Sequence, residues 1–315
     1  MNALALISGK LMKIYLNDLN ESWVVDRLKN EWNFHNAKIT TNRISKSDII
    51  WIIAPWVWKN VSKKHLSKKK VICSIYHLDF TKFDDKQKKD FYYRDEFVDQ
   101  YHVISQKTKK DLSELTSKKI ISIPFWVNQN IFRKLDNKEE IRKTFGFKDN
   151  DYLIGSFQRD TEGIDLKTPK LIKGPDILLE ILLEEYKNKP NMKVVLAGKR
   201  RQFILKELDN YSIPYKYFEM IDESKLNLLY NILDLYIVSS RLEGGPQAIL
   251  ECAISETPII STNVGVAPEI LSKGSIFQSS ETYKSAIPDS EEALKNVKKY
   301  SLPNGMSLFE NMFVD

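Results

Sequence analysis

Short apolar runs alternate with amphipathic segments along the whole chain. Runs rich in β-branched and aromatic residues are typical of strands buried in a sheet, whereas apolar residues spaced three and four positions apart are typical of helices. In the first half of the chain the runs predict strands at Lys13–Leu16, Ile49–Ile53, Val71–Ile75, Tyr101–Ile104 and Ile120–Ile123. Helices are predicted at Ser22–Trp32 and Lys107–Leu115, with two more between them.

The second half of the chain repeats this alternation. Its strands are predicted at Tyr152–Ser156, Lys193–Ala197, Tyr215–Phe218, Leu235–Val238 and Pro258–Ile260. Its helices are predicted at Pro175–Glu185, Phe203–Asp209, Glu223–Asn231 and Pro246–Ser255. Regular alternation of strand and helix predicts parallel sheets with helices on both faces, so the expected fold class is α/β with two doubly wound, Rossmann-like domains.

A polar stretch, Phe132–Asp151, separates the two sets of elements and is predicted to connect the two domains. We therefore expect an N-terminal domain at 1–136, a C-terminal domain at 137–290 and a helical tail at 291–315 that packs back on the N-terminal domain. All six tryptophans precede the polar stretch, which indicates that the two halves differ in role. A ligand site is expected in a cleft between the domains.

The composition of the chain excludes several classes of protein. Its 315 residues, 42% of them hydrophobic, suffice for two buried cores, which excludes a disordered or fibrous chain. The net charge of +6 reflects a modest lysine excess over abundant acids, so no nucleic-acid partner is expected, and RNA binding by the basic N-terminal face is kept as an alternative. No apolar run is long enough to span a bilayer. Cys73 and Cys252 lie far apart in apolar segments, which favours free thiols and a cytoplasmic location.

Residues 1–11 are interpreted as an extension of the chain. No basic residues precede their apolar run and no small-residue cleavage site follows it, so a signal peptide is not expected. Met12 stands directly before the first predicted strand, and the sequence leaves open whether residues 1–11 are native.

The most specific motif follows the predicted strand Leu235–Val238 and reads Ser-Ser-Arg-Leu-Glu-Gly-Gly-Pro-Gln-Ala-Ile-Leu-Glu over residues 239–251. Two glycines and a proline between a strand and a helix predict a tight turn whose backbone N–H groups point outward at a helix start, a geometry that binds anions. Glu243 precedes the turn and Glu251 lies inside the helix, so both carboxylates are expected at the carboxyl edge of the sheet. Carboxylates accept short, strong hydrogen bonds from hydroxyl groups such as those of a sugar.

This motif and its continuation to Glu269 resemble the family 4 (group 1) retaining glycosyltransferases of the GT-B fold, and the resemblance covers residues 150–272. It implies two Rossmann-like domains facing across a cleft, with the acceptor on the N-terminal side and a nucleotide-sugar donor on the C-terminal side. By the same resemblance, Glu243 contacts hydroxyl groups of the donor sugar and Glu251 holds the ribose. The donor-binding set that we assign with it also includes Gly244, Gly245, Pro246, Gln247, Gly198, Met220 and Ile221.

Two cations stand where the family has the residues that grip the donor diphosphate. Arg159 follows the strand Tyr152–Ser156, and Lys173 precedes the helix that starts at Pro175. Fixed cations stabilise the charge that builds on a leaving phosphate more in the transition state than in the ground state. Between them lies an insertion, Asp160–Asp165, which is expected to form a loop over the site. With this positive charge present and no Asp-x-Asp motif in a suitable place, neither a metal nor another cofactor is expected.

The first half of the chain resembles the family less closely. His77 follows the strand Val71–Ile75, where family members often place a histidine near the donor sugar. We assign it to the catalytic set together with Glu243, Arg159 and Lys173. The first strand-to-helix turn, residues 17–22, lacks the glycines that the family has there. Asn20 or Ser22 is expected to cap the helix instead.

A lysine-rich segment lies between the second and third predicted strands. Trp56 and Trp58 precede six lysines between residues 59 and 70. Aromatic residues beside a cationic cluster suit an anionic membrane surface and a lipid-linked acceptor, and a solvated lysine-rich helix with packed tryptophans is the alternative.

The sequence thus predicts a retaining glycosyltransferase of the hexosyltransferase class. It would move a sugar from a nucleoside diphosphate sugar to a glycan or lipid-linked acceptor, in the cytoplasm or on the membrane face. Because no carboxylate stands out as a nucleophile, the leaving phosphate is expected to take the acceptor proton on the same face. The alternatives are a nucleotide-sugar-binding protein and an epimerase-like enzyme on the same fold. The sugar, base, acceptor, linkage and oligomeric state are not determined by the sequence.

Overall fold

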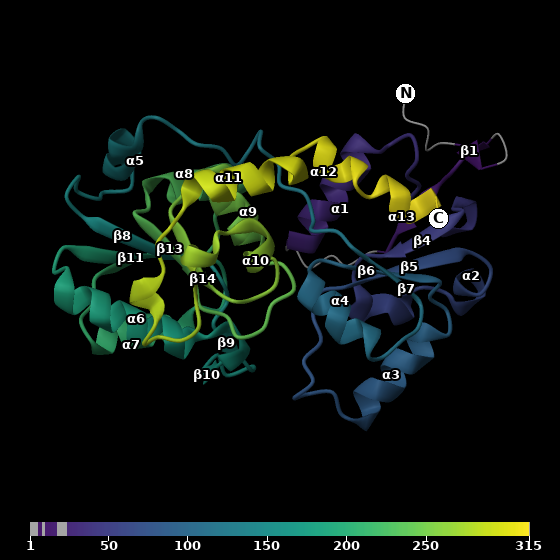
Figure 1. The fold of residues 1–315 in the computed structure, drawn as a ribbon, viewed down its shortest axis with the longest axis horizontal. Helices are drawn as coiled ribbons and strands as arrows, with labels where there is room; N and C mark the ends of the chain where they lie inside the picture. Colours follow the sequence, from purple (N-terminus) through teal and green to yellow (C-terminus); the bar gives the residue numbers. More distant parts are fainter. Residues whose placement is uncertain (1–5, 8–9, 18–23, 315) are drawn as a thin grey trace. The chain divides into compact units, whose positions relative to one another are not determined.

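The computed structural model describes residues 6–7, 10–17 and 24–314. Contacts within the chain divide it into two compact units, whose elements are drawn in Figure 1. Unit 1 consists of Met1–Trp126 and Leu302–Asp315, and unit 2 consists of Val127–Ser301. The chain therefore leaves unit 1 after Trp126 and returns to it at Leu302, whereas the sequence analysis placed the boundaries after residues 136 and 290.

Unit 1 is built on a sheet of five parallel strands in the order β3-β4-β5-β6-β7. These strands are β3 Ile14–Leu16, β4 Ile49–Ile52, β5 Lys70–Ile75, β6 Gln100–Val103 and β7 Lys119–Ser122. Every residue of β4 and β6 is buried, as in parallel sheets whose two faces are both covered. A short antiparallel pair, β1 Leu6–Ile7 and β2 Lys10–Leu11, precedes this sheet.

The helices of unit 1 connect these strands. They are α1 Val24–His35, α2 Lys63–Leu66, α3 Asp85–Asp95 and α4 Gln106–Ser113. Both α3 and α4 begin after a capping residue, Asp84 or Ser105, whose side chain accepts a hydrogen bond from a backbone N–H of the first turn. Asn20 and Ser22, which the sequence analysis proposed as caps of the first helix, lie outside the described residues.

The last helices of the chain complete the core of unit 1. They are α12 Asn304–Ser307 and α13 Glu310–Val314, drawn in yellow in Figure 1. The ring centroid of Phe313 lies 5.4 Å from that of Trp32 and 5.5 Å from that of Trp51, and all three side chains are buried. Phe309 is also fully buried, and its ring lies 5.7 Å from that of Phe125. Residues from the two ends of the chain therefore form one aromatic cluster.

Unit 2 is built on a sheet of six parallel strands in the order β12-β11-β8-β13-β14-β15. These strands are β8 Tyr152–Ser156, β11 Met192–Ala197, β12 Tyr215–Phe218, β13 Leu235–Val238, β14 Ile259–Thr262 and β15 Ile276–Phe277. Its helices are α5 Lys138–Thr144, α6 Pro175–Asn188, α7 Gln202–Asn210, α8 Glu223–Ile232, α9 Gln247–Ile254, α10 Ala267–Ile270 and α11 Ser290–Val297. Because the strands are parallel, the loops that follow β8, β11 and β13 lie at one edge of the sheet.

The insertion after β8 forms a hairpin of two short antiparallel strands, β9 Thr161–Glu162 and β10 Thr168–Pro169. The sequence predicts a loop over the site at Asp160–Asp165. The backbone N–H groups of Asp160 and Thr161 donate to Arg200 O, at 3.0 and 3.1 Å, so the base of the hairpin is fixed to the segment that precedes α7.

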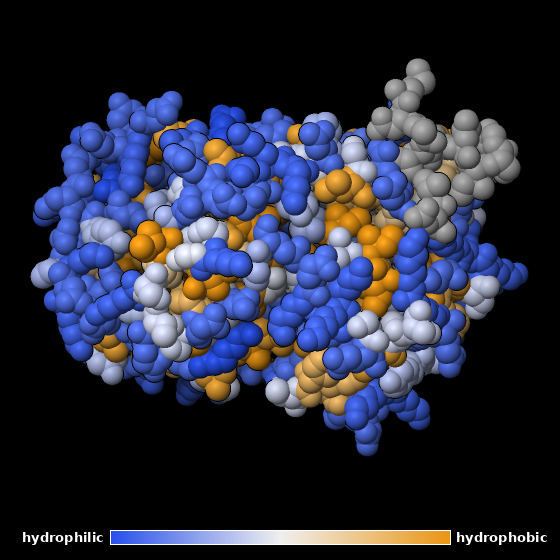
Figure 2. Space-filling view, in the orientation of Figure 1, coloured by the Kyte–Doolittle hydropathy of each residue, from blue (hydrophilic) through white to orange (hydrophobic). Residues whose placement is uncertain are grey.

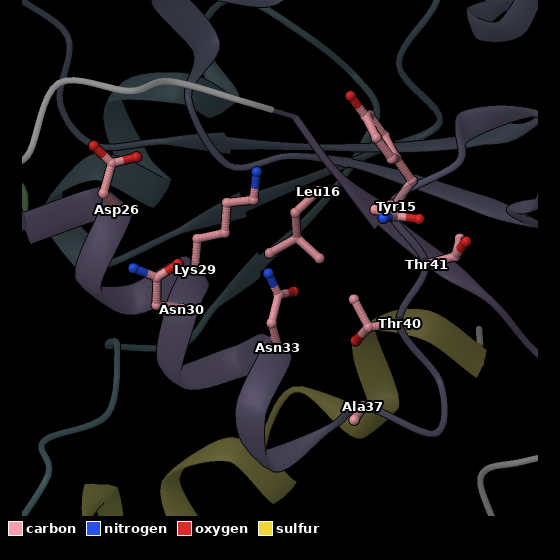
Figure 3. Close-up of a pocket in the computed structure, with 10 residues that line it drawn as sticks. Tyr15, Leu16, Asp26, Lys29, Asn30, Asn33, Ala37, Thr40 and Thr41 are labelled. Atoms are coloured by element: carbon pink, nitrogen blue, oxygen red, sulfur yellow. The ribbon is translucent and has the colours of Figure 1, made fainter.

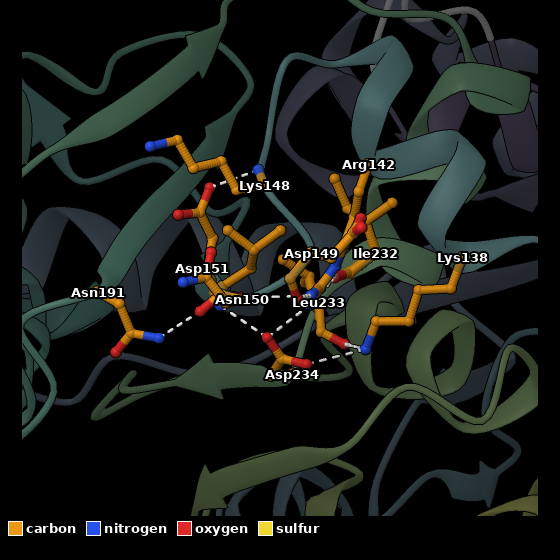
Figure 4. A network of polar contacts seen from close by, with 11 residues as sticks. Lys138, Arg142, Lys148, Asp149, Asn150, Asp151, Asn191, Ile232, Leu233 and Asp234 are labelled. Carbon is orange, nitrogen blue, oxygen red and sulfur yellow. Dashed lines mark hydrogen bonds and ion pairs between the residues drawn. The ribbon is translucent and has the colours of Figure 1, made fainter.

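The polar stretch Phe132–Asp151 is not a simple connection, because α5 lies within it and packs against α8. Arg142 of α5 is buried and donates to Ile232 O at 2.8 and 3.1 Å and to Asp234 Oδ2 at 2.6 Å (Figure 4). Asp234 Oδ2 also accepts a hydrogen bond from Leu153 N at 2.8 Å. A buried guanidinium with several carbonyl and carboxylate partners is a core interaction, and the whole of this stretch belongs to unit 2.

Within the described ranges, no helix is both long enough and apolar enough to cross a bilayer. The face of the molecule drawn in Figure 2 is mostly hydrophilic, and apolar residues reach it in separate patches. Large apolar side chains that are exposed to solvent include Trp56, Phe80, Ile164 and Met220.

Candidate functional site

The turn between β13 and α9 carries the motif that the sequence analysis selected. The backbone N–H groups of Arg241 and Leu242 both donate to Ile172 O, at 2.9 and 3.1 Å, which ties this turn to the loop before α6. Arg241 also donates two side-chain hydrogen bonds to Asp176 in the first turn of α6, at 2.7 and 2.6 Å. Helix α9 begins at Gln247, one residue later than predicted, with Pro246 before it. Two loops at the carboxyl edge of the sheet are therefore joined into one structure.

Lys173 and Glu243 form an ion pair at the point where these two loops meet. Their side chains are only 17% and 12% exposed. Ser240 Oγ lies 3.2 Å from Glu243 Oε1 and 3.0 Å from Gln158 Oε1, and Gln158 Nε2 donates to Lys173 O at 2.8 Å. The structure thus brings together two of the predicted catalytic residues, although they are far apart in the sequence, and adds two polar neighbours that the sequence analysis did not select.

Two glycines allow these loops to approach each other. Gly174 has φ +59° and Gly265 has φ +52°, a region that side-chain-bearing residues rarely adopt. A Cβ atom at position 174 would overlap the carbonyl oxygen of Ser239, and one at position 265 would overlap the carbonyl oxygen of Gly244. Both overlaps involve backbone atoms, so no side-chain movement can relieve them. Gly174 directly follows Lys173 and therefore helps to place its ammonium group.

Glu251 lies in α9, where its carboxylate is buried. Its Oε2 accepts a hydrogen bond of 2.7 Å from the hydroxyl of Tyr230, which is buried in α8. Burial and the neighbouring carboxylate raise the pKa of Tyr230 well above its usual value, so the hydroxyl stays protonated and donates. This contact holds the carboxylate of Glu251 in one orientation.

Lys170 adds positive charge close to Arg159 and Lys173. Arg159 follows Gln158 at the end of β8 and is partly buried, and it interacts electrostatically with Lys170. Burial, followed by the charges of Arg159 and Lys173, lowers the pKa of Lys170 to about 8. Arg159 and Lys173 both act on Lys170, and Lys170 and Lys173 also interact with Glu243, so three basic side chains are concentrated here. Such a concentration of cations suits a multiply charged anion.

The remaining donor-binding predictions lie in neighbouring loops of unit 2. Gly198 follows β11 with φ +91°, and its carbonyl oxygen accepts a hydrogen bond of 3.0 Å from the hydroxyl of Tyr217. Met220 is exposed and Ile221 is partly exposed in the loop between β12 and α8. The side-chain oxygen Oε1 of Gln247 is buried without a hydrogen-bond partner among the described residues.

His77 lies in unit 1, shortly after the end of β5, and is partly buried. It is therefore in a different unit from Glu243, and its place in the catalytic set stays a prediction.

Part of the lysine-rich segment packs into unit 1 and forms polar contacts there. Trp58 is buried and donates to Asp90 Oδ2 at 3.3 Å, and Lys59 pairs with the same carboxylate. Trp56, by contrast, is 51% exposed.

Unit 1 also holds a pocket of about 850 Å³ between α1, β3 and the loop that follows α1. Figure 3 shows Lys29 and Asn33 of α1 on one side of this space and Thr40 and Thr41 on the other. Its lining consists mainly of amide, hydroxyl and charged side chains.

Among the described residues, no three His, Cys, Asp or Glu side chains are grouped closely enough to hold a metal ion.

Comparison with known structures identifies the fold. A protein from Anabaena, Alr3699/HepE, crystallised with UDP and glucose, matches with a TM-score of 0.73 at 12% identity over 96% of this chain and 100% of that chain. Sucrose-phosphate synthase from Thermosynechococcus elongatus matches with a TM-score of 0.67 at 14% identity over 94% of this chain and 81% of that chain. A glycosyltransferase from Rickettsia africae has a TM-score of 0.60 at 16% identity over 95% and 84% of the two chains. These neighbours confirm the predicted α/β class with the two Rossmann-like domains of GT-B.

The sequence itself matches a family profile over the whole of the candidate site. No curated protein sequence matches the chain. The profile of the glycosyl transferases group 1 matches residues 137–301, which include Arg159, Lys173, Glu243 and Glu251. The chain therefore belongs to the group 1 glycosyltransferase family.

Proposed function

We propose that the chain transfers a hexose-type sugar from a nucleoside diphosphate sugar to a glycan or lipid-linked acceptor, with retention of configuration and without a metal ion. The observation that carries this proposal is the pairing of Lys173 and Glu243 beside the start of α9, within the region that matches the family. The UDP and UDP-glucose in the crystal structures of Alr3699/HepE support a nucleotide-sugar donor.

The proposed donor diphosphate lies against Lys173, Arg159 and the N–H groups at the start of α9. Negative charge grows on the leaving phosphate as its bond to the sugar breaks, and these groups stabilise it without solvent having to reorganise. Because they supply the positive charge, the proposal needs no divalent cation. In the free protein Glu243 neutralises Lys173, and on donor binding its carboxylate turns to the sugar hydroxyl groups.

The proposed role of Glu251 is to hold the ribose. The hydrogen bond from Tyr230 orients the carboxylate of Glu251, and carboxylate oxygens accept hydrogen bonds from hydroxyl groups such as those of a ribose. The base would lie beside Met220 and Ile221. Retention follows, in this proposal, from attack by the acceptor on the face that the phosphate leaves, with a phosphate oxygen accepting the proton.

A transfer assay with UDP-, GDP- and ADP-glucose tests this proposal. Thermal shift with the three compounds selects the donor, because a ligand that binds only the folded protein raises its melting temperature. Turnover of the selected donor to a glycan acceptor in the presence of EDTA then tests metal independence, and the NMR coupling constant of the new anomeric proton tests retention. Binding without turnover would favour the nucleotide-sugar-binding alternative.

Glu243→Gln is the variant that tests the site. It keeps the shape of the side chain and removes its charge, so we expect kcat to fall about 100- to 1,000-fold while the fold is retained. Glu139→Gln, an exposed position on α5, is the matched control and should leave kcat unchanged. Wild-type turnover by Glu243→Gln would remove this glutamate from the reaction.

An anionic membrane surface is a further partner that we propose, on the basis of exposed Trp56 and the exposed Lys64 and Lys68. Co-sedimentation with phosphatidylglycerol vesicles, compared with neutral phosphatidylcholine vesicles, checks it. Equal partition into both vesicle types would argue against this partner.

A further inference from the structure

The hairpin β9–β10 holds Lys170 beside the cations of the candidate donor site. Three hydrogen bonds fix its base to α7 and to the segment before it: Asp160 N and Thr161 N donate to Arg200 O, and Phe203 N donates to Thr161 Oγ1 at 2.9 Å. The buried side chain of Asp160 lies against the buried guanidinium of Arg201, with 3.1 Å between Oδ2 and Nε. A hairpin anchored in this way presents its last residues in a defined place.

The backbone fixes Lys170 on both sides. Its N–H donates to Asp160 O at 2.7 Å, and its carbonyl oxygen accepts a hydrogen bond from Lys173 N at 2.8 Å. Main-chain hydrogen bonds therefore connect Lys170 both to Asp160, the residue after Arg159, and to Lys173. Its side chain is partly buried, and the charged groups that act on its ammonium are Arg159, Lys173, Glu162 and Glu243.

We propose that Lys170 is a third cation of the donor site, which contacts the donor diphosphate together with Arg159 and Lys173 and takes up a proton from solution when the donor binds at weakly alkaline pH. This inference rests on the proposed function. It extends that function to a residue of the inserted hairpin and assigns to the hairpin a part in selecting ligands that carry two phosphates.

The charges around Lys170 link its protonation to donor binding. Without a ligand, burial and the two neighbouring cations disfavour the protonated form, and the pKa of Lys170 falls to about 8, although Glu162 and Glu243 oppose this shift. A bound diphosphate brings negative charge to the same place and favours the ammonium form. By linkage, an anion that raises this pKa must bind with net proton uptake wherever the free protein is partly deprotonated.

Isothermal titration calorimetry with UDP, GDP and ADP at pH 8.5 measures this uptake. Titrations in two buffers with different enthalpies of ionisation give the number of protons taken up from the buffer. At this pH roughly three quarters of a lysine with a pKa of about 8 is neutral, so we expect more than half a proton per site for the nucleotide that binds most tightly. The ligand itself contributes little, because its terminal phosphate is fully ionised well below pH 8.5.

Three variants assign the proton to Lys170. Lys170→Met should bind about 10- to 100-fold more weakly at pH 7, since it loses a charge-assisted hydrogen bond, and should take up no proton at pH 8.5. Lys170→Arg should bind well at both pH values and also take up no proton, because a guanidinium does not deprotonate in this range. Lys167→Met removes an exposed lysine of the same hairpin and should behave as the wild type.

The outcomes separate the two proposals. Failure of all three nucleotides to bind the wild-type chain would overturn the proposed function and this inference with it. Tight binding with equal affinity and equal proton uptake in the wild type and in Lys170→Met would overturn only the role of Lys170.

Discussion

Among single residues, Gly174 and Gly265 control how closely the loops of the donor site approach each other. Both have positive φ, and at both positions a Cβ atom would overlap a carbonyl oxygen of the neighbouring loop. Gly274 also belongs to unit 2, in the 3-10 turn Lys273–Ser275, but its φ is not positive and an added Cβ would have its nearest neighbour, Ser272 Oγ, at 3.8 Å. Glycine is therefore required at positions 174 and 265, whereas position 274 has room for a larger residue.

We expect Gly265→Ala to lower the free energy of unfolding by about 2 kcal/mol or more, because it adds backbone strain to a steric overlap with Gly244. Nucleotide binding should weaken in parallel, since Gly244 is part of the donor turn. Urea denaturation followed by circular dichroism, together with calorimetry, measures both effects. Gly274→Ala is the control and should change the free energy of unfolding by less than about 0.5 kcal/mol. Similar values for the two variants would contradict this account.

His102 is a buried histidine with no role in the predicted site. Its Nε2 donates to Ile123 O at 2.7 Å, and its Nδ1 accepts from Ser74 Oγ at 2.8 Å, while Ser74 Oγ accepts from Trp51 Nε1 at 2.9 Å. This chain of hydrogen bonds suits the neutral ring. Burial lowers the pKa of His102 to about 4, which the backbone hydrogen bond only partly opposes.

The shifted pKa predicts that unit 1 loses stability in acid. Between pH 6.5 and 4 the unfolded chain binds a proton at this histidine and the folded chain does not, so the contribution is complete above pH 6.5 and decreases as the pH falls toward 4. The loss should approach about 3 kcal/mol at pH 4. Urea denaturation at pH 7 and pH 5, followed by tryptophan fluorescence, measures it. His102→Gln should show a smaller pH dependence, and an unchanged dependence would assign the effect to other groups.

Among the elements, the strands were the easiest to predict. Strands such as β4 and β13 are buried along their whole length and are continuous apolar runs in the sequence, and all ten predicted strands exist. Helix α5 was missed because its sequence is polar and its long-range anchors, Lys138 and Arg142, are residue types that usually lie on the surface. The hairpin β9–β10 was missed because strands of two residues carry no periodic pattern.

The residues of the site could be predicted only where they belong to a contiguous sequence motif or directly flank a predicted element. Glu243 and Glu251 stand in such a motif, and Lys173 was found through its place before α6. Gln158 and Lys170 were not found, because their position depends on contacts between segments that are far apart in the chain. Lys170 also directly follows the hairpin β9–β10, outside the positions that the family resemblance assigned.

The helices α12 and α13 allow a direct test of how much one segment stabilises unit 1. Phe309 is fully buried among the rings of Trp51, Phe125 and Trp126, so we expect Phe309→Ala to destabilise unit 1 by about 3–5 kcal/mol. Leu308→Ala is the neighbouring control, because Leu308 is 39% exposed and should cost less than about 1 kcal/mol. Urea denaturation monitored by tryptophan fluorescence measures both. Equal effects would mean that these rings contribute little.

For the whole molecule, the division into units makes opposite predictions for two fragments. Residues 127–301 are contiguous and contain Arg159, Lys170, Lys173, Glu243 and Glu251. We expect this fragment to fold alone and to bind the nucleoside diphosphate within about tenfold of the affinity of the full chain. Residues 1–126 lack the rings of Phe309 and Phe313 and should remain unfolded. Circular dichroism and calorimetry of both fragments check this, and an unfolded fragment 127–301 would contradict it.

The return of the chain to unit 1 at Leu302 also sets an order of events during synthesis. A ribosome makes proteins from the N-terminus, and domains generally fold as their residues emerge. The first 126 residues emerge early but lack the helices that close their aromatic core, whereas unit 2 has all of its residues before Leu302 is added. The half that is translated first is therefore the half that finishes folding last, and its apolar surface is the one that chaperones would have to shield in the meantime.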